Sequence, residues 1–347
     1  VARALAALGL NATVHDPFGR GAGASGNPAA LVNLRLDAGL GPEAALFARG
    51  LARARALYLD IPGAVLGAGA LQLQAAERDL GRFRTIAGSD LFEPAALEVL
   101  NPEAAEALIG EPAPPALAIR EALTIRPDIV LGAWAQEVRI DAVAEITGEA
   151  DDFRLLNAAG AEIGKAGAVV LACAHGAVAL APSLDLQPIR GQITWAEGVT
   201  LSHAAGWGGY AIATPQGVLF GSTYDRDRTD AAPLAEDDAR NLENLALGLP
   251  RLARQLTGAK LHGRAAIRAA AADRLPLAGA VPDQAGLFVL SGLGSRGFSL
   301  APLLGEHVAA LIAGAPSPLA ASQAALVDPA RFQERAARRM RLASKPR

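Results

Sequence analysis

The sequence has few of the residues on which several common kinds of site depend. Its 347 residues include one cysteine, Cys173, and five histidines. A single cysteine excludes an internal disulfide framework and fits a reducing compartment. The histidines, at positions 15, 175, 203, 262 and 307, lack the paired spacing of metal ligands. We therefore predict no metal site and a cytoplasmic protein.

Aromatic residues and long apolar runs are also scarce. Aromatic residues make up 4% of the chain, and the net charge of −3 gives no overall field that attracts nucleic acid. The longest apolar run, 166–182, contains His175 and is too short to span a bilayer, so we expect no membrane partner. No G-x-S-x-G motif is present, and Cys173 lies in a predicted strand, where we interpret it as a core residue.

What the chain does contain is enough apolar sequence for a large core, since 51% of its residues are hydrophobic. Buried strands alternate with helices, and a mostly antiparallel, strand-rich section interrupts them at 187–225. This order predicts an α/β (α+β) fold: a discontinuous, Rossmann-like nucleotide-binding domain with an inserted, mostly antiparallel β substrate domain. The predicted ranges are 1–60, 127–180 and 262–347 for the first domain, and 61–126 and 181–261 for the second.

Individual elements follow from local patterns. We predict helices at 1–9, 42–60, 128–136 and 236–256, a short strand at 10–14, and a strand at 287–290. Residues 61–126 are predicted to be short segments, because proline and glycine interrupt them.

The segment around Asp16 has the order found after the glycine loop of a dinucleotide-binding unit. An acid that closes the second strand accepts hydrogen bonds from ribose hydroxyls, although Asp before Pro17 is also a common turn former. The loop 19–27 that follows offers backbone N–H groups to a pyrophosphate, with Ser25 and Asn27 as further donors, or is a flexible loop. No G-x-G-x-x-G loop precedes, so we expect the N-terminal strand and that loop to be missing.

A second glycine-rich loop, 292–297, follows the strand 287–290 and leads into a helix that we expect to begin near Ser299. A helix N-terminus carries unpaired N–H groups and partial positive charge. Aimed at the pyrimidine edge of a flavin, this end would stabilise the reduced anionic ring. The pattern also suits a phosphate site or an ordinary helix cap.

Arg268 is the only charge in the middle of an apolar stretch, and such an arginine needs an anionic partner. One interpretation is a structural salt bridge with Asp273. The other is planar, bidentate recognition of a substrate carboxylate.

Together these segments resemble the D-amino-acid-oxidase-type (DAO) family of FAD-dependent oxidoreductases. Within it they are most similar to the oxidase modules of bifunctional tRNA wobble-uridine-modifying proteins. The matching stretches keep family order and cover nearly the whole chain from about residue 12. They are "GASGNPAALVNLRL" (23–36), "PIRGQITW" (188–195), "GGYAIATPQGVLFGSTYDRD" (208–227), "RAAIRAAAADRLPLAG" (264–279), "GLFVLSGLGSRGFSLAPLLGE" (286–306) and "LVDPARF" (326–332).

The resemblance implies an FAD enzyme that oxidises the carboxymethylaminomethyl group of the tRNA wobble uridine. Hydrolysis of the resulting imine would release glyoxylate and leave an aminomethyl group. A small-molecule amine, glycine or D-amino acid oxidase on the same scaffold is an alternative, as is a non-catalytic RNA-binding fragment. In the intact bifunctional protein a methyltransferase domain lies upstream.

The resemblance also assigns residues. Asp16 would bind the ribose, and Arg268 would hold the substrate carboxylate, with Tyr210 beside it. The remaining FAD contacts would be Gly23, Ser25, Gly26, Asn27, Val143, Ala172, Gly294, Ser295, Arg296 and Gly297. Two basic segments, 251–274 and the tail 331–347, are candidate tRNA contacts or simply solvated surface.

Overall fold

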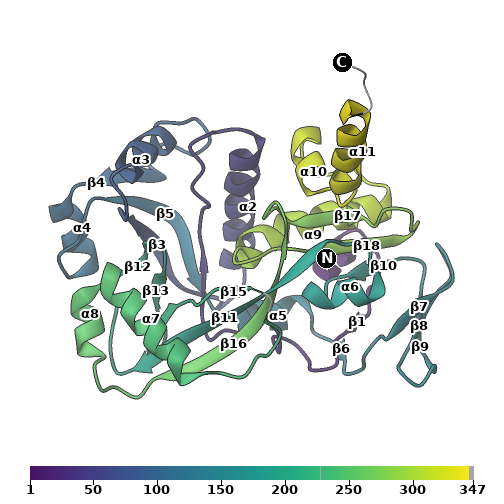
Figure 1. The fold of residues 1–347 in the computed structure, drawn as a ribbon, viewed down its shortest axis with the longest axis horizontal. Helices are drawn as coiled ribbons and strands as arrows, with labels where there is room; N and C mark the ends of the chain where they lie inside the picture. Colours follow the sequence, from purple (N-terminus) through teal and green to yellow (C-terminus); the bar gives the residue numbers. More distant parts are fainter. Residues whose placement is uncertain (227, 344–347) are drawn as a thin grey trace.

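A computed structural model describes residues 1–226 and 228–343, and for 338–343 it describes the backbone alone. Figure 1 shows a large sheet on one side of the molecule and smaller sheets of mostly short strands on the other. The predicted combination of parallel strands, helices and an antiparallel section is present.

The large sheet has the strand order β15–β11–β14–β13–β12–β3–β5–β2, with β16 paired to β11 and β4 paired to β5 (Figure 1). Apart from the parallel pair β3–β12, its neighbours are antiparallel. Its strands are β2 (Ala30–Val32), β3 (Val65–Leu73), β4 (Leu97–Leu100), β5 (Ala116–Ile125), β11 (Leu186–Glu197), β12 (Ala204–Gly206), β13 (Tyr210–Ala213), β14 (Gly217–Gly221), β15 (Asp225–Arg226) and β16 (His262–Ala271).

The other parallel strands form two separate pairs. Strand β1 (Val14–His15) pairs with β6 (Val138–Arg139), and β10 (Val169–Leu171) pairs with β18 (Leu287–Ser291). An antiparallel strand, β17 (Leu277–Ala280), borders β18. A small antiparallel sheet consists of β7 (Glu145–Thr147), β8 (Phe153–Leu156) and β9 (Glu162–Ala166).

Two long helices pack against each other, one beside β2 and β5 and the other beside β17 and β18. In α2 (Pro42–Leu59) the first helical residue is proline, and buried residues recur on one face. It packs against α9 (Gly297–Ala313) so tightly that a Cβ on Gly50 would lie 2.7 Å from Leu300 Cδ2. The Tyr58 hydroxyl donates to the Phe298 carbonyl at 2.8 Å. These contacts fix the first turn of α9, which begins two residues before the predicted start at Ser299.

The remaining helices cover the sheets. The pair α7 (Ala235–Gly248) and α8 (Pro250–Gln255) buries Phe220 and Leu245 against one face of the large sheet. The others are α1 (Ala2–Ala7), α3 (Asp79–Ala87), α4 (Pro102–Ile109), α5 (Pro127–Trp134), α6 (Ala177–Leu180), α10 (Ala321–Val327) and α11 (Arg331–Ala343). No helix within the described residues combines the length and apolar character needed to cross a bilayer.

The segment 61–126 differs from its prediction. It contains the long strands β3 and β5, which run antiparallel to one another. Glycines within β3, at 67 and 69, break the alternation of apolar residues, and the pairing with β5 shifts register at both. The strand exists because β5 supplies its hydrogen-bond partners. The domain boundaries themselves stay a prediction; β16, which begins at His262, pairs with β11 of the large sheet.

Asp273 binds two arginines at the start of α11, and this contact should make the stability of the fold depend on pH. Burial alone would raise its pKa, but hydrogen bonds from Arg331 and Arg335, and the Leu275 N–H, hold the pKa at about 2. A depressed carboxyl pKa stabilises the fold above about pH 4, and that contribution disappears as the pH falls toward 2. We expect Asp273→Asn to lower the free energy of unfolding by about 1–2 kcal/mol at pH 7 and by about a third of that at pH 2.5.

Urea unfolding at both pH values measures this difference. The exposed Asp90→Asn serves as the matched control. Equal destabilisation by Asp273→Asn at the two pH values would contradict the assignment.

Candidate active site

Arg264 on β16 holds the glycine-rich loop 19–27. Its Nη2 donates to the carbonyls of Gly21, Ala22 and Gly23 at 3.0, 3.0 and 2.6 Å, and its Nη1 donates to Asn27 Oδ1 at 3.0 Å. Because the C=O and N–H of a planar trans peptide point in opposite directions, the N–H groups of Gly23 and Ala24 point away from Arg264. From the sequence, Arg264 is only one cation of the basic segment 251–274. Its position four residues before Arg268, on the same face of a strand, was the available signal.

The loop is also closed on itself. A Cβ on Gly26 would lie 1.7 Å from the Gly21 carbonyl oxygen, whereas a Cβ on Gly23 would meet nothing within 4 Å. Ser25, between them, is half-buried. Glycine at 26 is therefore required by close backbone approach, and glycine at 23 is not.

Asp16 lies where β1 ends. Its N–H donates to the Arg139 carbonyl of β6 at 3.0 Å, and its Oδ1 accepts the Phe18 N–H at 2.9 Å. The side chain is half-buried. Val143, also half-buried, lies in the connection between β6 and β7.

Ala172 and Cys173 directly follow β10 and are exposed. The prediction that Cys173 is a core residue is wrong, because β10 ends at Leu171 and the chain turns into a 3-10 helix, Ala174–Gly176. Partial burial of the thiol raises the pKa of Cys173, and the nearby Asp16 carboxylate raises it further. The ends of β1 and β10 are thus within electrostatic range of each other.

This thiol is a reporter for a ligand at these strand ends, since it is the only one in the chain. We expect saturating FAD to slow alkylation of Cys173 by iodoacetamide at least about tenfold, because a cofactor beside Asp16 covers the sulfur. In the flavin-free protein, Asp16→Asn should speed alkylation at pH 8, because it removes one cause of the raised thiol pKa. Mass spectrometry of the labelled protein measures both rates. Unchanged labelling at saturating FAD would place the cofactor elsewhere.

The second glycine loop connects β18 to α9. Gly292 and Gly294 have φ values of +68° and +53°, and the Gly294 N–H donates to the Ala269 carbonyl of β16 at 3.1 Å. A Cβ on Gly294 would meet nothing within 4 Å, and Ser295 is exposed. The loop therefore has an open side, next to the strand that carries Arg268.

Arg296 precedes Gly297, the first residue of α9. Its Nη1 donates to the Asn33 carbonyl at 3.3 Å. Burial first, and the charge of Arg35 second, lower the pKa of Arg296 to about 10. Ser299 makes two hydrogen bonds with the Asn33 backbone, which join the start of α9 to the end of β2. A helix N-terminus and an arginine without a carboxylate partner in the described residues make this end strongly positive.

Arg268 contacts the segment that follows β14. Its Nη2 donates to Ser222 Oγ and to the Thr223 carbonyl, both at 3.1 Å. The salt bridge with Asp273 considered from the sequence is wrong, because Asp273 binds Arg331 and Arg335 instead. Within the described residues no carboxylate pairs with Arg268.

Tyr210 lies close enough for the Arg268 charge to affect its titration. Burial raises the pKa of Tyr210 to about 12, and the Arg268 charge opposes that rise. The phenol is therefore protonated at neutral pH. The Tyr224 ring centroid lies 6.0 Å from Arg268 Cζ.

Register places these groups on one face of the large sheet. Ile193 pairs with both Arg264 and Gly221, and Tyr210 pairs with Gly221, so their side chains share a face. Arg268 is four residues from Arg264 and shares it too. The opposite face packs against α7 and α8.

The comparison with known families decides the classification. The model of the family described as FAD dependent oxidoreductase (DAO) matches residues 1–311. The chain belongs to this family. The chain is 50% identical, over 339 residues, to the tRNA 5-methylaminomethyl-2-thiouridine biosynthesis bifunctional protein MnmC of Caulobacter sp. (strain K31). That match covers 97% of this chain and 56% of the relative.

A second MnmC, from Caulobacter vibrioides, is 48% identical over 96% of this chain and 55% of its own length. The DAO-family chain thus spans about half the length of these curated relatives. Glycine oxidase from Geobacillus kaustophilus has a TM-score of 0.77 at 21% identity, with 92% of each chain covered. L-proline dehydrogenase from P. horikoshii has a TM-score of 0.77 at 20% identity, covering 96% of this chain and 94% of that one. These structures confirm the mixed α/β fold.

The residues present fit an FAD. The carboxyl ends of β1, β10 and β18 carry Asp16, the exposed Ala172 and the open loop at Gly294. Dinucleotides bind at this edge of parallel strands, with an acid for the ribose and glycines for close backbone approach. The positive N-terminus of α9 suits an anionic group.

Only some side chains of the two basic segments are exposed and so can contact a binding partner. In 251–274, Arg264 and Arg268 turn into the protein, while Arg251, Arg254, Lys260 and Arg274 are exposed. In the tail, Arg331 is 4% exposed and binds Asp273. The side chains of Arg338, Arg339 and Arg341, and all of residues 344–347, lie outside the described residues.

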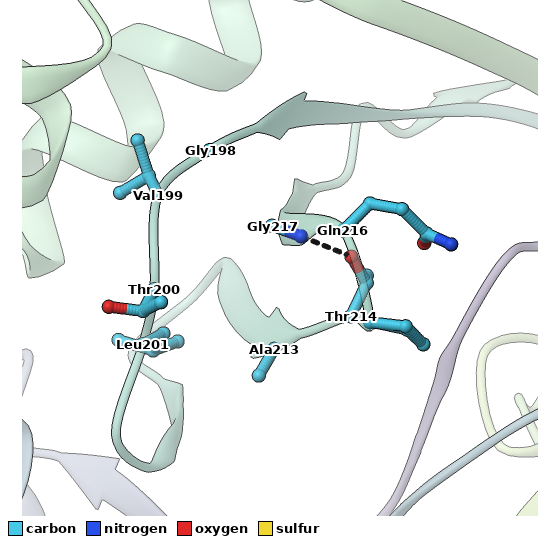
Figure 2. A pocket seen from close by; sticks show the side chains of 9 residues that line it. Gly198, Val199, Thr200, Leu201, Ala213, Thr214, Gln216 and Gly217 are labelled. Carbon is cyan, nitrogen blue, oxygen red and sulfur yellow. Dashed lines mark hydrogen bonds between the residues drawn. The ribbon is translucent and has the colours of Figure 1, made fainter.

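A surface hollow of about 280 Å³ lies at the turn between β13 and β14. Figure 2 shows its lining, with the Gly217 N–H donating to Thr214 Oγ1 at 3.0 Å. Tyr210 and Gly221 are at the opposite ends of these two strands, roughly 10 Å away. The hollow is therefore separate from the Arg268 site. Its residues are 198–201 and 213–217.

Proposed function

We propose that this chain carries out the FAD-dependent oxidation of the carboxymethylaminomethyl group on the wobble uridine of tRNA, releasing glyoxylate and leaving an aminomethyl group. The observation that supports it best is Arg268, a half-buried guanidinium without a carboxylate partner in the described residues. The similarity to the two MnmC proteins supports the tRNA substrate.

Arg268 suits an N-substituted glycine. Both of its hydrogen bonds within the described residues use Nη2, so Nη1 and Nε remain for a ligand. A planar guanidinium binds a carboxylate through two parallel N–H···O bonds, one of which always comes from Nη2, so a bidentate ligand would use Nη1 or Nε and share Nη2 with Ser222 or Thr223. Tyr210, protonated at neutral pH, would donate a hydrogen bond beside Arg268 and would not act as a base.

The chemistry removes two electrons from the substrate. Bound FAD would supply the hydride acceptor, and oxygen would reoxidise it. The glycine Cα loses a hydride and the secondary amine loses its proton, which gives a C=N bond. Water adds to that bond, and its cleavage yields glyoxylate and the primary amine. During this reaction Arg268 would hold the carboxylate, which would determine which carbon is oxidised.

The cofactor contacts are part of the proposal. Asp16 would accept from the ribose hydroxyls, and Val143 would meet the adenine. Gly23, Ser25, Gly26 and Asn27 would line the phosphates and ring, and Ala172 would lie beside the cofactor. Gly294, Ser295, Arg296 and Gly297 would close over the isoalloxazine. Exposed cations at 251, 254, 260 and 274 would contact tRNA phosphates.

The deciding experiment uses purified full-length protein and tRNA that carries carboxymethylaminomethyl-uridine. We expect a bound flavin spectrum, conversion of the nucleoside, and one glyoxylate per modified tRNA. Intact nucleoside without glyoxylate would contradict the proposal.

Two other outcomes identify the alternatives. Arg268 could equally hold a free amino acid. Peroxide from glycine or sarcosine, with no response to tRNA, would identify a small-molecule oxidase. Salt-sensitive tRNA binding without flavin would identify a non-catalytic RNA-binding protein.

A further inference from the structure

A buried ion network lies on the opposite face of the large sheet from Arg268, and the proposed function does not use it. Arg190 on β11 is fully buried, at 0% exposed, and pairs with the buried Asp237 of α7. Arg240 joins Asp237 to Asp225 of β15, at 2.8 and 3.0 Å. Arg190 Nη1 lies 3.8 Å from the same Asp225 carboxylate. Arg190 Nε also lies 3.4 Å from Asp230, which Arg228 binds at 2.8 Å, so three arginines and three aspartates balance in charge.

Gln192, two residues after Arg190, binds the two chain segments that flank this network. The Gln192 backbone N–H donates to Thr223 Oγ1 at 2.9 Å, and its carbonyl accepts the Thr223 N–H at 3.1 Å. Its side-chain amide exchanges two hydrogen bonds of 2.8 Å with the Leu234 backbone. Arg190 also donates to the carbonyls of Asp230 and Ala232, at 3.1 and 2.7 Å. Arg190 and Gln192 therefore hold both Ser222–Arg226 and the segment 230–234 that leads into α7.

Gly191, between them, provides space for Arg268. A Cβ at Gly191 would lie 1.6 Å from Arg268 Nη2 and 2.9 Å from the Thr223 carbonyl oxygen. The guanidinium lies across the backbone of Gly191 to reach Ser222 and Thr223. Any side chain at 191 would occupy that path.

A buried ion network gains little stability over apolar side chains of the same size, whereas it demands one geometry. We propose that Arg190, Gly191 and Gln192 are positioning residues for the substrate site: they fix Ser222–Arg226, and that segment fixes the guanidinium of Arg268 that binds the carboxylate. This inference rests on the proposed function. It adds that substrate affinity is set partly by Asp225 and Arg190, which do not contact substrate.

Asp225→Asn tests the link. The substitution keeps the shape of the side chain and removes the charge that ties this segment to Arg190 and Arg240, while Asp237 still neutralises Arg190. In the FAD-loaded, full-length protein we expect KM to rise about tenfold and kcat to stay within twofold, because the lost interaction acts equally on substrate and transition state. The Kd of acetate, read from the flavin absorption spectrum, should rise by the same factor.

A further readout does not depend on turnover. Hydrogen exchange of peptides that cover Ser222–Arg226 should speed up about tenfold in Asp225→Asn, since the Thr223 N–H bonds Gln192 only while the segment is held. Asp225→Glu restores the charge and should recover most of the affinity. Glu98→Gln, which removes the exposed partner of Arg120, is the matched control and should change none of these quantities.

The outcomes separate the two proposals. If wild type binds acetate and Asp225→Asn leaves Kd, KM and exchange unchanged, the positioning role is overturned and the proposed function stands. A lower melting temperature with unchanged Kd and KM also overturns it, because the network is then only structural. If wild-type protein binds neither acetate nor substrate, the proposed function fails and this inference fails with it.

Discussion

Replacing Arg268 by alanine is expected to lower kcat/KM by at least about 100-fold while the FAD content stays unchanged. Removing one partner of a desolvated, hydrogen-bonded charge pair costs about 2–5 kcal/mol, and roughly 3 kcal/mol corresponds to that factor. Arg268 contacts Ser222 and Thr223 rather than either glycine loop, so flavin retention should not depend on it. Steady-state kinetics and the flavin-to-protein absorbance ratio measure the two effects.

Arg268→Lys sharpens the test. Lysine keeps the charge but loses the planar pair of donors, so we expect it to recover only a small part of the activity. Arg120→Ala removes an exposed arginine elsewhere and should behave as wild type. Loss of flavin in Arg268→Ala, with unchanged activity per bound flavin, would show that this residue serves the cofactor and not the substrate.

Gly26→Ala is expected to abolish FAD retention. The added Cβ would lie 1.7 Å from the Gly21 carbonyl oxygen and 2.9 Å from Arg264 Nη2, so the loop must open and the hydrogen bonds from Arg264 must break. The contact is with backbone, which cannot rotate away as a side chain would. We expect the purified variant to be colourless and its FAD Kd to rise at least about 100-fold, as for a loss of roughly 3 kcal/mol.

Gly81→Ala is the control. Gly81 lies in α3 and in neither glycine loop, and its added Cβ would meet nothing within 4 Å. It should retain FAD, with a Kd within about threefold of wild type. Equal FAD loss in the two variants would show that the loss does not come from the closed loop shape that Arg264 holds.

Local patterns predicted the elements whose stability is mostly local. The helix predicted at 42–60 is observed at Pro42–Leu59, because proline at the first helical position and apolar residues on one face specify it. The order of strand, glycine loop and helix at 286–313 also follows from adjacent residues. Asp16 could be singled out because it directly follows a short strand.

Residues that act through distant strands could not be predicted in this way. Strand β3 contains glycines that predict a loop. The segment forms a strand only because it pairs with β5, some fifty residues later. The sequence predicts Cys173 to be a core residue because the apolar run does not show where β10 ends. The structural partner assigned to Arg268 was the acid nearest in sequence, whereas its contacts lie at Ser222 and Thr223.

The sequence by itself determined the family resemblance, the glycine loops, the acid after the first strand and the arginine in the middle of an apolar stretch. These depend on residue type and on spacing within about twenty residues. The tertiary structure alone decided that Arg264 holds the loop at Gly21–Asn27, and that Gly191 leaves room for Arg268. Both depend on the register between strands far apart in the chain, and a register shifted by one residue would turn every one of these side chains to the opposite face.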